Sequence, residues 1–343
     1  MSADRERMGG DPERVRAEPN QAGEGSERIH GDPERVRAGD RVLELGGGVG
    51  GRLIMGIVNA SPDSFSDGGR YATLDAQLEL AQSLLADGAE ILDIGGESAS
   101  TGRPTVSVEE EIERVVPLVE RVAGELGAIV SVDTYKPPVA RAAIEAGARI
   151  VNDVSGLRDP ELARVCAQTG AALVLMHTRA APKRRLQDPD LYGDVVGEVH
   201  AFLGERIERA LALGIDPDQL ILDPGPDFAK TPAQTIELLA GVGRLHELGR
   251  PLLMAVSRKD FIGALTGRPP RERLPGTLAA LAHGVDAGAR IFRVHDVAAA
   301  ADFLKVRAAL AGELVPRRDL ALAEEHRYER DESSSESRMP GER

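Results

Sequence analysis

Short apolar segments alternate with longer amphipathic segments through most of this chain, and this pattern limits its fold more than any other feature. The apolar segments have the length and continuous hydrophobicity of buried parallel strands, and the amphipathic segments have helical spacing. Strands are expected at 51–59, 91–95, 129–132, 149–151, 171–176, 220–222, 251–256 and 291–294. Helices are expected at 74–87, from 107 onward, at 138–146, 160–168, 195–213 and 232–240, within 271–287, and at 298–311.

Eight strands, each followed by a helix over roughly 260 residues in all, are typical of an α/β fold of the (β/α)8 TIM-barrel class. A doubly wound open sheet is the alternative. It usually has fewer strands, and it carries a GxGxxG turn after its first strand, which this chain lacks. We therefore predict a barrel, preceded by a hairpin between 41–45 and 51–59. The glycine-rich link of that hairpin lacks the Lys-Ser/Thr of a phosphate-binding loop.

The two ends of the chain differ from this pattern. Residues 1–40 are polar and contain the octamer GDPERVRA twice, at 10–17 and 31–38, which predicts a disordered arm before a barrel at 41–311. A docking peptide is the alternative role for this arm. Residues 317–343 are charged and rich in serine, and they predict a disordered C-terminal tail.

Composition excludes several classes of protein. The 343 residues carry a formal charge of −14, which argues against the basic surface of a nucleic-acid-binding protein. Aromatic residues make up 3%, so the core is expected to be aliphatic. A single cysteine, Cys166, excludes an intramolecular disulfide framework. Because no apolar run reaches the length of a membrane span and no signal-peptide segment is present, we expect a cytoplasmic protein.

Residues 55–69, MGIVNASPDSFSDGG, begin as a buried strand and end in Asn59 and a polar loop. An ordinary loop between a strand and a helix has a similar composition. Other expected strands, however, end in or next to polar side chains as well: Asp133, Asn152, His177, Asp223, Lys259, Arg293 and His295. In a barrel these residues would meet at one mouth, where ligands bind. Helix capping does not explain the Lys, Arg and His among them, and an internal salt-bridge network is the remaining structural alternative.

Two kinds of chemistry are present in this set. Arg293, His295, Asn59 and Ser257 suit an anion such as a phosphate or diphosphate. No cluster of His, Cys and carboxylates has metal-ligand spacing, so no built-in transition metal is implied. A Mg²⁺ ion that arrives with a diphosphate needs only one or two protein oxygens.

The other kind of chemistry is that of hydrogen-bond acceptors. Asp133, Asn152 and Asp223 would accept hydrogen bonds from a planar heterocycle with amino and ring N–H groups. Lys259 could donate to a carbonyl of the same ring. The set contains no strong nucleophile, which favours chemistry by binding and charge stabilisation.

At these residues the chain resembles dihydropteroate synthase, of the pterin-binding barrel superfamily. The resemblance covers about residues 41–311 and rests on MGIVNASPDSFSDGG, DIGGES, SVDTYK, NDVSG, LMH, ILDPG, VSRKDFIG and RVHDV, in family order. It implies a transferase of folate biosynthesis that joins a dihydropterin methyl diphosphate to 4-aminobenzoate and releases diphosphate. It also implies a homodimer, formed through late helices.

The resemblance also implies residue roles. Pterin would be held by Asp133, Asn152, Asp223 and Lys259, and the diphosphate and its Mg²⁺ by Asn59, Arg293 and His295, with Asn59 as the metal ligand. Phe228, Ser257 and Lys259 would border the aminobenzoate. Lys259, Arg293 and Asp133 would be catalytic. Diphosphate would leave first, and the arylamine would then attack the pterin cation.

Two loops depart from the family pattern. Ala99 stands where a substrate-contacting Thr is expected, followed by Ser100 and Thr101 in place of Arg and Pro. The segment 226–230, PDFAK, lacks the usual two glycines around its Phe, which predicts a stiffer loop. These changes leave two alternatives to a working synthase. One is a pterin-binding protein without synthase activity, and the other is a related methyltransferase with a corrinoid partner, against which the SRK and RVH residues argue.

Overall fold

A computed structural model describes residues 34–60, 73–97, 104–323 and 326–327. Within them, eight parallel strands form one sheet in the order β8-β7-β6-β5-β4-β3-β10-β9. A parallel bridge between Leu222 and Leu252 joins the two ends of this order and closes the barrel. The strands are β3 (Leu53–Asn59), β4 (Ile91–Gly95), β5 (Ile129–Asp133), β6 (Ile150–Asp153), β7 (Ala172–Met176), β8 (Leu220–Asp223), β9 (Leu253–Met254) and β10 (Ile291–Val294). The predicted fold class is confirmed.

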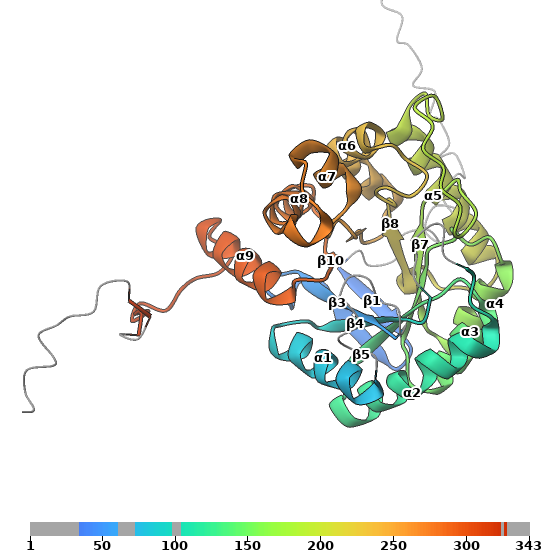
Figure 1. Ribbon diagram of the computed structural model, residues 1–343, viewed down its shortest axis with the longest axis horizontal. Helices are drawn as coiled ribbons and strands as arrows, with labels where there is room; N and C mark the ends of the chain where they lie inside the picture. The colour runs from blue at the N-terminus through green and yellow to red at the C-terminus, as the bar shows by residue number, and fades with distance from the viewer. Residues whose placement is uncertain (1–33, 61–72, 98–103, 324–325, 328–343) are drawn as a thin grey trace, which may run out of the picture.

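Helices cover the outside of the strands (Figure 1). They are α1 (Leu74–Ala86), α2 (Val108–Leu126), α3 (Pro137–Glu145), α4 (Pro160–Thr169), α5 (Val195–Ala212), α6 (Pro232–Ala240), α7 (Asp260–Thr266), α8 (Leu274–Asp286) and α9 (Val297–Leu310). Short 3-10 helices lie at η1 (Pro217–Gln219), η2 (Val242–Leu248) and η3 (Pro270–Glu272). The sequence did not predict α7, because seven residues are too few to show a helical period. None of the described helices is both long enough and apolar enough to span a bilayer.

The interior of the barrel changes from apolar to polar along several of its strands. Side chains two residues apart lie on the same face of a strand, so β10 places Ile291 in the apolar interior and Arg293 one layer above it. The same step leads from Ile150 to Asn152 on β6. The polar layer therefore lies at the carboxyl ends of the strands, where a barrel binds its ligands.

A hairpin of β1 (Arg35–Ala38) and β2 (Arg41–Glu44) packs against the other end of the barrel. Val36, Ala38, Leu43 and Leu45 are buried together with the apolar interior residues of the strands. The main chain of Gly39 also donates a hydrogen bond to the carbonyl oxygen of Gly170, which precedes β7.

The hairpin was predicted, but with the wrong strands. The expected partner, 51–59, belongs to the barrel as β3, and the true partner is the second copy of the octamer. Alternating arginines hide the strand pattern of that copy in a polar segment. The proposed boundary at residue 41 is therefore wrong, and the structured unit includes β1. Residues 1–33 and 328–343 lie outside the described part, so the predicted disorder of the tails stays a prediction.

Two truncations test the role of β1. Deletion of residues 1–33 should change the free energy of unfolding by less than about 0.5 kcal/mol, because the hairpin stays complete. Deletion of residues 1–40 should lower it by about 3 kcal/mol or more, because Val36 and Ala38 are lost and Leu43 and Leu45 become exposed. Urea titrations measure both values. Equal stability of the two truncated proteins would show that the hairpin does not support the barrel.

Candidate active site

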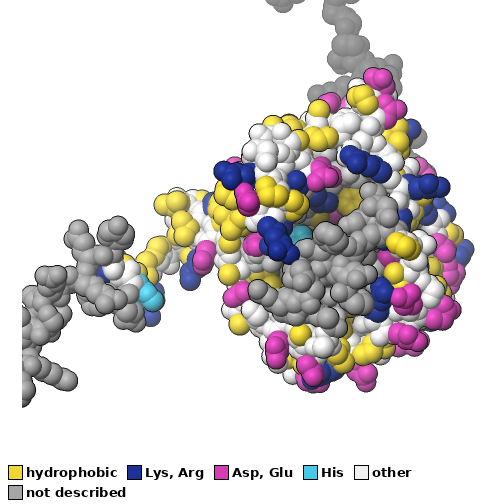
Figure 2. All heavy atoms as spheres, viewed as in Figure 1, with side chains coloured by type: hydrophobic (Ala, Val, Ile, Leu, Met, Phe, Trp, Pro, Cys, Tyr) yellow, Lys and Arg dark blue, Asp and Glu magenta, His cyan; other side chains and the backbone are white. Residues whose placement is uncertain are grey.

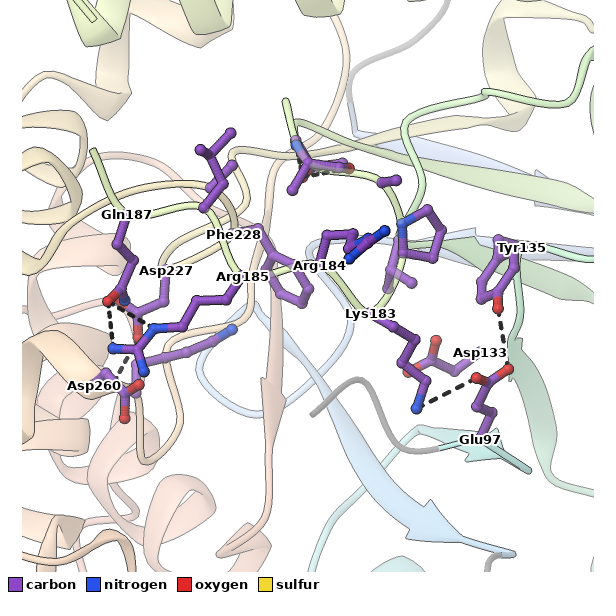
Figure 3. A pocket seen from close by; sticks show the side chains of 18 of the residues that line it. Glu97, Asp133, Tyr135, Lys183, Arg184, Arg185, Gln187, Asp227, Phe228 and Asp260 are labelled. Carbon is purple, nitrogen blue, oxygen red and sulfur yellow. Dashed lines mark hydrogen bonds and ion pairs between the residues drawn. The ribbon is translucent and has the colours of Figure 1, made fainter. Parts of the chain in front are cut away.

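A pocket of about 420 Å³ opens at the carboxyl ends of the strands. The carboxyl end of β5 contributes Asp133 to its lining, and loops that follow β4, β7, β8 and β9 contribute Glu97, Lys183, Phe228 and Lys259. Figure 2 shows this face of the molecule, with Lys and Arg side chains around the hollow. Figure 3 shows that the lining residues come from loops far apart in the sequence.

Arg293 is the centre of the polar layer. Its Nε donates to Asp93 Oδ2 at 2.6 Å, and its Nη2 donates to Asp133 Oδ2 at 2.9 Å. Asp93 Oδ2 also accepts a hydrogen bond from Asn152 Nδ2 at 3.0 Å. These contacts bring together side chains from β4, β5, β6 and β10. The structure thus gives Arg293 two carboxylate partners, in addition to the diphosphate role that the family resemblance implies.

Asp93 was missed as a site residue. It lies within the DIGGES motif, but only polar residues at or just after the ends of the expected strands were selected, and Asp93 lies in the middle of a strand. The period of two along β4 places Asp93 on the same face as the interior residue Ile91, and its side chain is fully buried. The two-residue period of side chains along β4 would therefore have identified Asp93 as an interior polar residue.

Two carboxyl groups of this layer, those of Asp133 and Asp223, have raised pKa values. Burial, together with the nearby charge of Asp93, raises the pKa of Asp133 to about 7, although Arg293 acts in the opposite direction. Burial also raises the pKa of Asp223, whose Oδ1 accepts a hydrogen bond from the backbone N–H of Gly225 at 2.7 Å. Asp93 Oδ1 and Asn152 Oδ1 are buried without a hydrogen-bond partner among the described residues. Donors from a ligand or an ordered water would satisfy them.

His295 and Ser257 form a second group in the layer. Ser257 Oγ lies 3.0 Å from His295 Nδ1 and accepts a hydrogen bond from the backbone N–H of His295 at 3.2 Å. Burial, followed by the charge of Arg258, lowers the pKa of His295 to about 3, so the imidazole is neutral near pH 7. Arg258 itself forms two hydrogen bonds with Asp296, at 3.0 and 2.6 Å. His295 therefore meets an anion as a neutral hydrogen-bonding group.

Lys259 and Phe228 face one another at the edge of the pocket. The Nζ of Lys259 lies 4.5 Å from the centroid of the Phe228 ring, a cation–π contact, and burial lowers the pKa of this lysine. Asp227 and Ala229, on either side of Phe228, have φ values of 66° and 51°. That left-handed conformation is easy for glycine and costs other residues about 1–2 kcal/mol each. The glycines that the family resemblance implies around this Phe would adopt the same conformation without strain.

Asn59 ends β3 and pairs in register with Gly95 of β4, which places it at the rim of the polar layer. Ala99 and its neighbours at 98–103 lie outside the described residues, as does the loop at 61–72. His177 does not join the pocket. It packs against Phe202, with ring centroids 4.8 Å apart, and burial lowers its pKa to about 2.

An ion network at the rim was also missed by sequence reasoning. Lys136 Nζ donates to Glu97 Oε2 at 2.7 Å and to Glu111 Oε2 at 2.6 Å. Lys183, from the loop after β7, reaches across the pocket to Glu97 Oε1 at 3.3 Å (Figure 3). Tyr135 donates to the same carboxylate. The network ties three loops together, and no spacing in the sequence indicates which loops meet.

Comparison with known proteins assigns this site to a class. The family model described as "Pterin binding enzyme" matches residues 55–295, a range that runs from within β3 to just past the end of β10. Its span holds every member of the polar layer described above. The chain belongs to this family of pterin-binding enzymes.

Individual relatives within the family are dihydropteroate synthases. The dihydropteroate synthase of Synechocystis sp. is 45% identical over 259 residues, which cover 75% of this chain and 89% of the relative. The Bacillus subtilis dihydropteroate synthase is 44% identical, with 75% and 88% covered. Among solved structures, Xanthomonas albilineans dihydropteroate synthase with 4-aminobenzoic acid superposes with a TM-score of 0.74 at 44% identity, covering 83% of this chain and all of that one. The chain is thus similar to dihydropteroate synthases along nearly their whole length.

Asp133 should give the protein a measurable pH dependence. Its pKa is about 7 in the folded state, against 3.8 for an ordinary Asp, so between these values the folded protein keeps a proton that the unfolded chain has lost. The contribution of Asp133 to the free energy of unfolding is therefore lost as the pH rises from 3.8 to about 7. The unfolding free energy of Asp133→Asn, relative to wild type, should increase from pH 4 to pH 7 by on the order of 1 kcal/mol per unit. Denaturant titrations across this range measure the difference, and a constant difference would contradict the pKa assignment.

Proposed function

We propose that this protein is a dihydropteroate synthase. It is a transferase that condenses (7,8-dihydropterin-6-yl)methyl diphosphate with 4-aminobenzoate to give 7,8-dihydropteroate and diphosphate. Solved neighbours support both sides of this reaction. One is the Xanthomonas albilineans enzyme in complex with 7,8-dihydropteroate, with a TM-score of 0.71 and 44% identity. Another is the enzyme from the same organism with 4-aminobenzoic acid.

The observation that carries the proposal is the acceptor layer around Arg293. A pterin presents an amino group and ring N–H groups, and Asp133, Asp223 and Asn152 offer oxygens from three different strands. Lys259 can donate to the ring carbonyl. Because Arg293 links Asp93 and Asp133, the acceptors are held in place before the ligand arrives.

The reaction needs a departing anion and an entering amine. The C–O bond between the pterin methylene and the diphosphate breaks, and its electron pair leaves with the diphosphate. The arylamine nitrogen then forms the C–N bond and releases a proton. His295, Ser257 and Arg293 would stabilise the charge that develops on the leaving oxygen. Phe228 and Lys259 would hold the arylamine ring next to the methylene.

Magnesium is part of the proposal. No group of three or more His, Cys, Asp or Glu side chains in the described part of the chain could hold a metal. Mg²⁺ carried by a diphosphate fits this arrangement, because phosphate oxygens and water fill most of its coordination shell. Asn59, at the rim of the layer, would supply one protein oxygen. When bound, the ion would neutralise part of the diphosphate charge.

A homodimer and a cytoplasmic location are also proposals. Val306 and Leu310 on α9 are 58% and 84% exposed, and an apolar surface on a late helix supports a homodimer formed through that region.

A pterin-binding protein without synthase activity is the competing function. The departures at Ala99 and Pro226 are what favour it. A steady-state assay with purified protein, both substrates and Mg²⁺ separates the two functions. The synthase produces dihydropteroate and diphosphate in equal amounts. Binding of the pterin substrate with no product would instead establish the competing function.

Substitution of Lys259 tests the assigned residue. Lys259→Ala should lower kcat/KM by at least about 100-fold, because the group contacts the substrates in the transition state. The melting temperature should change little, since the side chain lies at the pocket edge. Lys305→Ala is the matched control, because Lys305 is exposed on α9. A normal rate in Lys259→Ala would remove Lys259 from the active site.

A further inference from the structure

The loop at 225–230 between β8 and α6 carries Phe228 to the pocket in a strained conformation. Asp227 and Ala229 both have left-handed backbone angles, although neither is a glycine. Gly225 packs against the end of β7, where a Cβ atom would meet the carbonyl oxygen of His177 at 2.0 Å. A loop with this strain keeps its shape only when surrounding contacts hold it.

Lys230 supplies the central contacts. Its side chain is fully buried, and its Nζ donates to the carbonyl oxygens of Gly225 at 2.8 Å and Phe228 at 3.0 Å. A third contact, at 2.8 Å, joins Nζ to His177 Nδ1. A buried amine is costly unless its hydrogen bonds are satisfied, and these three partners account for them. Lys230 thus binds the loop on both sides of its strained Asp227.

Other groups bind further polar atoms of the loop. Tyr192 donates its hydroxyl hydrogen to the carbonyl oxygen of Ala229 at 2.9 Å. The backbone N–H of Asp227 donates to Thr235 Oγ1 at 3.1 Å, and Asp227 Oδ2 accepts from the backbone N–H of Asp260 at 2.5 Å. Lys230 and Tyr192 are not among the residues that line the pocket. Their contacts act on the loop backbone, and through it on Phe228.

We propose that Lys230 is a positioning residue for the second substrate. By holding the carbonyl groups on both sides of Asp227, it fixes the Phe228 ring beside Lys259, where the aminobenzoate ring would lie. Tyr192 supports the same loop from its other end. The proposal rests on the proposed synthase function. Lys230 would support binding of 4-aminobenzoate but not binding of the pterin diphosphate.

The protonation of the pair agrees with this geometry. Burial lowers the pKa of Lys230 to about 7. Burial, followed by the charge of Lys230, lowers the pKa of His177 to about 2, so the imidazole is neutral. The charged amine has three N–H donors for its three partners. The neutral amine has two for the carbonyls, and its lone pair can accept from Nδ1–H of the imidazole.

The test is Lys230→Met, which keeps most of the side-chain volume and removes the donors. The KM for 4-aminobenzoate should rise about tenfold, the factor expected for one lost buried hydrogen bond, and the KM for pterin diphosphate should change less than about twofold. Gln219→Met is the matched control. Gln219 is also buried and donates to two backbone carbonyls, of Cys166 and Ala171, at the opposite end of β8. It should lower stability but leave both KM values unchanged.

Ala229→Gly provides a rescue, because glycine adopts the left-handed conformation without strain. In the Lys230→Met background it should restore at least half of the lost affinity for 4-aminobenzoate, on a logarithmic scale. A merely structural loss would not be relieved by glycine at that position. If Lys230→Met does not fold, Tyr192→Phe removes the other support and should raise the same KM, again with rescue by Ala229→Gly.

Hydrogen exchange separates this proposal from the synthase assignment. In the substrate-free protein, the amide of Phe228 should exchange at least about tenfold faster in Lys230→Met than in wild type or Gln219→Met. Faster exchange of this amide in a protein without synthase activity would support the role of Lys230 in holding the loop and would refute the synthase function. An active enzyme in which Lys230→Met leaves both KM values unchanged, or raises both equally, would overturn the proposal. Absence of rescue by glycine would also overturn it.

Discussion

The ion pairs of Arg293 with Asp93 and Asp133 are the interaction on which the site depends. The guanidinium of Arg293, on β10, binds carboxylates on both β4 and β5. Asp93, the β4 carboxylate, also accepts a hydrogen bond from Asn152 on β6. Buried charges are tolerated only when they are paired and hydrogen-bonded, so removal of one partner would leave the others uncompensated. The pairing links side chains of four strands at the mouth of the barrel and holds the acceptor oxygens that we propose for a pterin.

The apolar half of the barrel makes this polar layer possible. Interior aliphatic residues and the hairpin fill the amino end of the strands, so the barrel is sealed on one side and open on the other. In the charged layer, the side chains of Asp93, Asn152 and Asp223 are almost fully buried. That restricted exposure raises the pKa of Asp133 and keeps His295 neutral. Fold and chemistry thus share one arrangement. On strands such as β4, β6 and β10, interior positions are apolar near the amino end and polar near the carboxyl end.

The sequence predicted the barrel, its strands and most of the polar layer, because hydrophobic period and strand ends are local features. It did not predict what depends on contacts across the fold. The partners of Arg293, the pairing of Lys230 with His177 and the reach of Lys183 to Glu97 join residues far apart in the chain. The hairpin was placed on the wrong strands because the octamer containing Val36 reads as polar. The strain at Ala229 required backbone angles that no residue pattern specifies.

We propose that the polar layer binds a pterin diphosphate. Calorimetric titration of the purified protein with this ligand and Mg²⁺ tests that binding. We predict saturable binding of one ligand per chain that weakens at least about 100-fold in Arg293→Met, since that change leaves Asp93 and Asp133 without their partner. No binding by the wild-type protein at millimolar ligand would contradict both the synthase and the pterin-binding functions, and would leave only the barrel.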